Sequence, residues 1–183
     1  VAVDEKIIKA AGDDKKKLGS NATVAVSLAV CAAAAYAKGK PVYQYLDPKA
    51  YRIPVPLLNV INGGKHAGNN LAIQEFMLIP KKFKSFKEAL RAGTETYKTL
   101  GKLLERKYGR SAINVGAEGG YAPPMRTTEE ALEILSEAIE ETGYSKQMPD
   151  VQVQTPRDNY DVQPDTKTLV SGSETFGVTL KTA

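Results

Sequence analysis

Cysteine is almost absent from this sequence of 183 residues, and its one copy, Cys31, has no partner for an internal disulfide. We therefore expect a protein of a reducing compartment. Cys31 also lies in an alanine-rich stretch, which makes it a poor candidate for a catalytic nucleophile.

Long apolar runs and a secretory leader are missing as well. The least polar stretch, 22–37, contains Thr23 and Ser27 and is shorter than the about 20 apolar residues that cross a bilayer. The first residues, 1–17, are charged and lack the apolar segment of a signal peptide. These absences predict a soluble, cytoplasmic protein with no membrane partner.

Charge of one sign is not concentrated in the chain. There are 25 lysines and arginines against 21 aspartates and glutamates, a formal net charge of +4. The lysine runs at 15–17 and 81–82 lack the interleaved aromatic residues of a surface that follows a phosphate backbone. We therefore predict no nucleic-acid partner.

Apolar residues, by contrast, are plentiful. A hydrophobic share of 42 % with 25 % charged residues is typical of a folded soluble domain. The length fits one domain or two small ones, and it excludes a complete eightfold barrel, which takes roughly 250 residues.

Four segments have helical patterns: 4–11, 21–38, 85–107 and 127–142. The second is apolar all round, so we expect it to be internal and packed on more than one side. The last two begin with capping-box sequences and are followed by glycine.

A continuous apolar run at 57–61 is typical of a strand buried on both faces, as in parallel sheets. A second apolar run, 71–80, is interrupted in its middle by the polar pair Gln74 and Glu75. A short strand at 113–115 leads into the glycine-rich loop 116–120. The order strand, strand, helix, strand, helix predicts an α/β fold with one sheet. In such folds the functional groups lie at the carboxyl ends of the strands.

Three polar residues lie in or beside a glycine-rich turn or an apolar strand, where a charge is costly to hold: His66, Glu75 and Glu118. Two carboxylates and the only histidine form a plausible acid/base set. Spacing alone leaves a structural interpretation open. His66 is then a turn residue, Glu75 the outward residue of a half-exposed strand, and Glu118 a loop charge.

Five linked segments carry a family resemblance: 18–22, 54–56, 59–69, 74–77 and 114–123. Their sequences are LGSNA, PVP, NVINGGKHAGN, QEFM and NVGAEGGYAP, in this order. The chain resembles the enolases, the phosphopyruvate hydratases of glycolysis, over about residues 3–144.

The resemblance implies a partial fold. Residues 1–46 correspond to the helical part of the enolase N-terminal α+β domain, and 47–145 to the start of the barrel domain, so the barrel is incomplete. Residues 146–183, with short alternating pieces, are predicted as an irregular or β-like tail. A homodimer is the assembly that the family implies.

In the enolases a lysine removes the C2 proton of 2-phosphoglycerate and two Mg²⁺ ions stabilise the enediolate, as is established for that superfamily. A glutamic acid then protonates the leaving 3-hydroxyl, which gives phosphoenolpyruvate. By resemblance Glu118 is this catalytic acid, Glu75 is the catalytic partner carboxylate that also binds substrate, and His66 contacts the substrate.

Three departures from the family bear on activity. Ala117 stands where the enolases have an aspartate beside the acid. The first metal-binding aspartate is expected at the carboxyl end of the next strand, where this chain has Gln152 and Gln154, with Asp150 at the other end. The lysine base and the later metal ligands have no counterpart, so the magnesium ligands cannot be assigned.

Two hypotheses follow from these departures. In the first, the chain is one piece of a longer enolase and has no activity alone. In the second, it is an enolase-derived, non-catalytic binding or structural component of a larger assembly.

Overall fold

The computed structural model describes residues 2–12, 17–64, 67–148, 150–154 and 175–179. The chain divides into two compact units, Val1–Arg52 and Ile53–Ala183. Each unit is described by itself.

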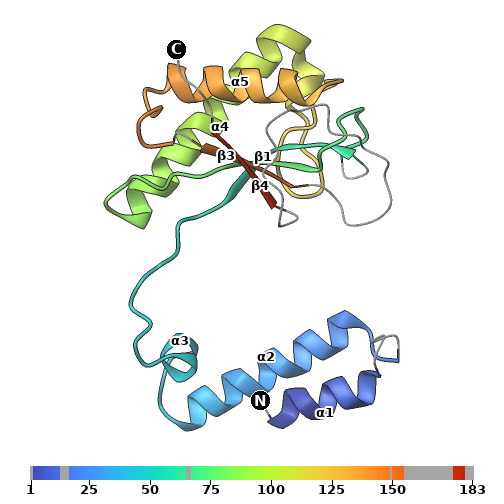
Figure 1. The fold of residues 1–183 in the computed structure, drawn as a ribbon, viewed down its shortest axis with the longest axis vertical. Coiled ribbons are helices and arrows are strands. Elements are labelled where there is room, and N and C mark those ends of the chain that lie inside the picture. Colours follow the sequence, from blue (N-terminus) through green and yellow to red (C-terminus); the bar gives the residue numbers. More distant parts are fainter. Residues whose placement is uncertain (1, 13–16, 65–66, 149, 155–174, 180–183) are drawn as a thin grey trace. The chain divides into compact units, whose positions relative to one another are not determined.

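The first unit consists of helices. These are α1 (Ala2–Ala11), α2 (Ser20–Ala37) and α3 (Val42–Leu46), and both α1 and α3 contact α2 (Figure 1). The helices predicted at 4–11 and 21–38 are confirmed. The short helix α3 was not predicted.

The expectation that α2 is internal is wrong for this structure. Ala35 is its one buried residue, and Leu28 is 65 % exposed. The reason is that, among the described helices of the unit, α1 and α3 pack against α2 and leave most of this apolar helix uncovered. By length and composition α2 is also the one described helix that could cross a membrane, a test that core helices of soluble proteins pass as well. The expectation that this stretch is too short for a span therefore does not hold.

The second unit is built on a four-stranded sheet in the order β1 (Leu58–Asn62), β2 (Glu75–Leu78), β3 (Asp150–Gln154) and β4 (Thr175–Thr179). All neighbouring strands are antiparallel, so the predicted parallel pairing is wrong for these pairs. The described residues between β1 and β2 form no α-helix, which is the usual crossover of a parallel pair. Because β2 runs against both neighbours, β1 and β3 point in the same direction.

Two helices connect β2 to β3: α4 (Phe86–Tyr108) and α5 (Thr128–Glu141) (Figure 1). Their starts confirm the predicted caps. The Ser85 hydroxyl accepts the Glu88 N–H at 3.2 Å, and the Thr127 hydroxyl accepts the Glu130 N–H at 3.2 Å. Both helices pack on the sheet in one core, whose largest side chains include Phe76, Leu78, Leu100, Leu104, Ile134 and Leu135. Mixed helices and an unclosed sheet make this a partial α/β fold, as predicted.

The strand predicted at 113–115 is not formed. Its place is taken by a 3₁₀ turn, η2 (Arg110–Ile113), and by isolated bridges that join Tyr121 to Val115 and to Ile61. The Tyr121 N–H donates to the Val60 carbonyl at 2.9 Å, and the Asn62 N–H donates to the Tyr121 carbonyl at 2.8 Å. The chain folds back after η2 because Tyr121 occupies the edge of β1. This docking brings the glycine-rich loop to the sheet.

Candidate active site

One edge of the sheet gathers the polar residues. The strand register places Asn62, Glu75 and Gln154 in a single cross-strand row. This row contains the carboxyl ends of β1 and β3, and the start of β2. Asp150 lies at the opposite end of β3, where it forms an ion pair with Lys81. The sequence expectation that Asp150 is at the wrong end of its strand is confirmed.

The glycine-rich loop closes on itself beside this edge. The Gly116 N–H donates to the Gly120 carbonyl at 2.8 Å, and the Gly119 N–H donates to the Gly116 carbonyl at 3.1 Å. Gly119 has a φ of +84°, a conformation that glycine adopts without strain. The tight turn presents Glu118, which is exposed.

Three side-chain amides hold the Glu118 carboxylate. Asn59 Nδ2 and Asn62 Nδ2 donate to Oε2 at 3.0 and 3.1 Å, and Gln74 Nε2 donates to Oε1 at 3.5 Å. These donors come from β1 and from the residue before β2. Neutral amides fix the orientation of a carboxylate without placing an opposite charge beside it.

Asn62 connects the loop to the acid. Its side chain is fully buried, and its Oδ1 accepts the Gly120 N–H at 3.0 Å while its Nδ2 donates to Glu118. A Cβ atom at Gly116 would lie 2.9 Å from Asn62 Oδ1, and one at Gly120 would lie 2.8 Å from it. Both positions therefore require glycine because the Asn62 amide approaches the loop backbone so closely.

A tyrosine pair supports the loop from the side of α4. The Tyr97 hydroxyl donates to the Gly119 carbonyl at 2.8 Å, and the Tyr97 ring stacks on Tyr121. Burial, and then the neighbouring Tyr121, raises the pKa of Tyr97 to about 12. Tyr97 is therefore a protonated donor across the physiological range.

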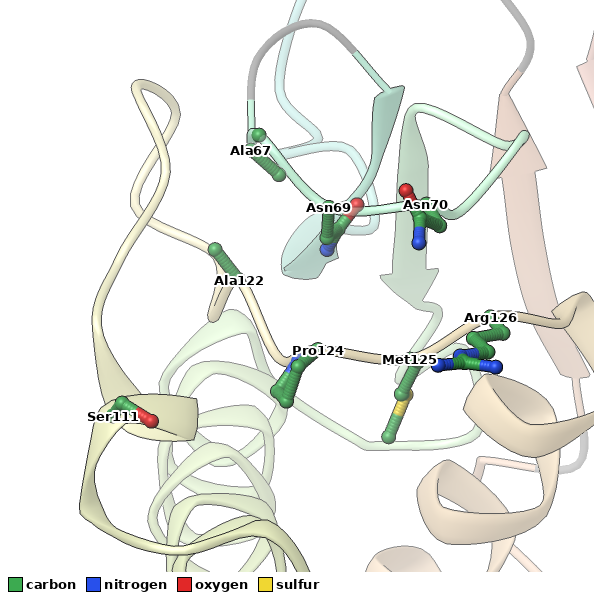
Figure 2. Close-up of a pocket in the computed structure, with 9 residues that line it drawn as sticks. Ala67, Asn69, Asn70, Ser111, Ala122, Pro124, Met125 and Arg126 are labelled. Atoms are coloured by element: carbon green, nitrogen blue, oxygen red, sulfur yellow. The ribbon is translucent and has the colours of Figure 1, made fainter.

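Asn69 holds the segment that follows β1. Its Nδ2 donates to the carbonyls of Asn62 at 3.0 Å and Pro123 at 2.9 Å, and its Oδ1 accepts the Leu71 N–H at 3.3 Å. Beside it is an open pocket of about 360 Å³. Figure 2 shows Asn69 and Asn70 on one side of this pocket, with Pro124, Met125 and Arg126 opposite. The remaining lining residues are Ala67, Gly68, Ser111 and Ala122.

The structure brings two of the three predicted site residues to the same edge. Glu75, half-buried, begins β2 directly after Gln74, whose amide reaches Glu118. His66 lies outside the described residues. The catalytic and binding roles of all three residues stay predictions.

Sequence reasoning did not single out the three amides that hold Glu118. A signal was present, because Asn59 and Asn62 interrupt an apolar strand. A buried amide in such a run needs partners of its own, and those partners mark a site.

The described residues were also tested for a magnesium site. Among them, no group of three His, Cys, Asp or Glu side chains comes together. No magnesium ligands are therefore assigned among the described residues.

The comparisons with known proteins agree with this architecture. Residues 50–161 match the family model "Enolase, C-terminal TIM barrel domain", and residues 1–46 match "Enolase, N-terminal domain". The fold and site thus define part of a barrel-type α/β domain that carries a carboxylate, preceded by a separate N-terminal domain. The chain belongs to the enolase family, as the resemblance predicted.

Curated relatives are similar over most of the chain. An enolase of Methanopyrus kandleri is 58 % identical over 145 residues, which cover 78 % of this chain and 34 % of that protein. An enolase of Methanosarcina barkeri is 58 % identical over 134 residues, covering 73 % of this chain and 31 % of the relative. Enolase B of Dictyostelium discoideum is 53 % identical over 148 residues, covering 78 % and 33 %. The chain spans about a third of the length of these relatives.

Proposed function

We propose that this chain supplies the carboxylate part of an enolase, a lyase that interconverts 2-phosphoglycerate and phosphoenolpyruvate in glycolysis. Family membership supports the reaction. The observation that carries the proposal is the Glu118 carboxylate, exposed to a substrate yet held by amides from two strands. Such a group is oriented before the substrate arrives, which is what general acid catalysis requires.

In this proposal Glu118 acts as the general acid. The bond between C3 and its hydroxyl oxygen breaks with both electrons going to oxygen, and the proton of the neutral Glu118 carboxyl passes to that oxygen, which leaves as water. The resulting carboxylate is the form that accepts the N–H groups of Asn59 and Asn62. Glu75 is the partner carboxylate, and His66 contacts the substrate.

The proposed reaction also involves a metal cofactor. Magnesium is the cofactor that the family implies, and when bound it stabilises negative charge on the enediolate. We also propose a cytoplasmic homodimer that binds neither nucleic acid nor membrane.

A second candidate is an enolase-derived binding or structural component. The strand register favours this second candidate, because Gln154 occupies the carboxyl end of β3, in the row of Glu75, where an enolase is expected to have an aspartate. Ala117 is a second departure, since the family has an aspartate there. A chain of this kind would keep the fold and lose turnover.

Replacement of Glu118 tests the proposed activity. In the full-length gene product with Mg²⁺ and 2-phosphoglycerate, we expect Glu118→Gln to lower kcat by at least about 100-fold, because the acid is lost while the shape is kept. Glu140→Gln, at an exposed position of α5, is the matched control and should turn over normally. Normal turnover by Glu118→Gln would show that the acid is misassigned. A wild-type protein without turnover would favour the binding component.

A further inference from the structure

We propose that Asn62 is a positioning residue that binds Oε2 of Glu118, so that Oε1 delivers the proton. The inference rests on the proposed function, because it specifies how that acid is aimed. It goes beyond that function by naming a residue that touches no reacting atom, and by distinguishing the two oxygens of one carboxyl group.

The orientation of the Asn62 amide is fixed by partners of opposite type. Its Oδ1 accepts the N–H of Gly120 at 3.0 Å, and its Nδ2 donates to Glu118 at 3.1 Å. A flipped amide would place its NH₂ group against the Gly120 N–H and its oxygen against the carboxylate. Both contacts would then be repulsive, so one orientation is favoured.

Burial holds the Asn62 amide in a fixed position. The Asn62 side chain has no exposed surface, and glycines at 116 and 120 leave space for it. The residue also donates its backbone N–H to Tyr121 at 2.8 Å, and its carbonyl accepts Asn69 Nδ2 at 3.0 Å. Since main chain and side chain are both fixed, the position of Nδ2 relative to β1 is fixed as well, and Glu118 is aimed from it.

The hydrogen-bond pattern distinguishes the two oxygens of Glu118. Oε2 accepts two N–H donors, from Asn59 and Asn62. A proton on Oε2 would point at these donors and break at least one hydrogen bond, which leaves a largely buried N–H unsatisfied. A proton on Oε1 keeps both bonds to Oε2 and competes with the longer contact from Gln74 Nε2, at 3.5 Å. The hydrogen bonds from the described amides therefore favour a proton on Oε1.

Asn59, unlike Asn62, binds Glu118 without also binding the glycine-rich loop backbone. Its Nδ2 binds Glu118, while its buried Oδ1 has no partner among the described residues. Asn59 thus binds the acid without anchoring the loop, whereas Asn62 does both. This difference makes the two residues separable by mutation.

The decisive variant is Asn62→Asp in the full-length gene product. It keeps an oxygen acceptor for the Gly120 N–H and removes the donor to Glu118. We expect kcat to fall about 10- to 100-fold with KM for 2-phosphoglycerate within twofold, and the Gly120 amide to keep its protection from hydrogen exchange. Asn21→Asp, at an exposed position of α2, is the matched control and should match the wild type.

Two results would overturn the proposal. One is wild-type kcat in Asn62→Asp. The other is loss of kcat only together with loss of Gly120 protection, because this pattern indicates a purely structural role. Should Asn62→Asp fail to fold, Asn59→Ala provides the second variant, with an expected fall in kcat and no change in Gly120 protection.

A spectroscopic measurement separates this proposal from the proposed function. With ¹⁵N-labelled asparagine, Glu118→Gln should shift the side-chain NH₂ signals of Asn62 and Asn59 and leave those of Asn70 in place. This result is expected whether or not the protein turns over 2-phosphoglycerate. Unmoved Asn62 signals would refute the positioning role, and absent wild-type turnover would refute the reaction alone.

Discussion

Tyr97 lies flat against Tyr121, with 4.2 Å between the ring centroids and 7° between the ring planes. The two residues come from α4 and from the end of the loop that carries Glu118. Gly101 allows this contact, because a Cβ atom there would lie 2.5 Å from the Tyr121 hydroxyl oxygen. The stacked rings thus attach the loop that carries Glu118 to α4.

Removal of the Tyr97 hydroxyl should destabilise the attachment of this loop. Tyr97→Phe keeps the stacked ring and removes the donor to the Gly119 carbonyl, so we expect a loss of about 1 kcal/mol in the free energy of unfolding. Urea titration measures this change. Tyr36→Phe is the control, because Tyr36 is 88 % exposed and its change should have no measurable effect. Equal stability of wild type and Tyr97→Phe would show that the hydroxyl adds nothing.

The stability of the protein at alkaline pH should depend on Tyr97. An unfolded tyrosine has a pKa near 10, whereas burial raises the pKa of Tyr97 to about 12. The folded state therefore retains a proton that the unfolded state loses, and the resulting stability is complete below pH 10 and falls as pH rises toward 12. Unfolding measured between pH 8 and 12 should show a shallower decline in Tyr97→Phe. Parallel curves would contradict this expectation.

Gly120→Ala should damage both stability and turnover. The new methyl group would lie 2.8 Å from Asn62 Oδ1, so the buried amide must move, at a cost of about 1–3 kcal/mol. Gly143→Ala is the comparison. Its φ of +74° makes alanine strained, but the space around it is open, so it should lower stability and leave kcat unchanged. The prediction fails if the two variants have the same kcat.

Part of the loss of stability at low pH should come from Glu130, near the start of α5. The Tyr108 hydroxyl donates to the Glu130 carboxylate and lowers the pKa of Glu130 below its ordinary 4.5, against a smaller opposing effect of burial. A lowered pKa in the folded state adds stability above pH 4.5 that is lost as pH falls through the lowered value. Thermal melts from pH 6 to 3 should therefore show a smaller decline for Glu130→Gln than for wild type. Glu133→Gln, exposed on the same helix, should decline as wild type does.

The sequence predicted best what depends on neighbouring residues. Ser85 and Thr127 were identified as caps because each bonds to an N–H three residues ahead. Glu75 and Glu118 stood out because charge is unusual beside apolar strands and glycine turns, and both reached the same sheet edge.

What the sequence could not predict depends on distant partners. A continuous apolar run reports burial on both faces but not the direction of the neighbouring strand, so β2 was expected to be parallel to β1. The run 113–115 formed no strand because Tyr121 took the place at the edge of β1. The all-round apolar pattern of α2 indicates surfaces to be covered, yet α1 and α3, the described helices that pack on it, leave most of them exposed.

The separation between the acid and its amides has a consequence for assembly. Asn59, Asn62 and Gln74 lie 59, 56 and 44 residues before Glu118. The hairpin that carries these amides can form from local pairing, whereas Glu118 arrives only after α4 has bridged the gap. Closing a loop of that length costs conformational entropy, and contacts between distant residues form later than local ones. We therefore expect a partly folded chain to contain the hairpin before the acid is positioned on it.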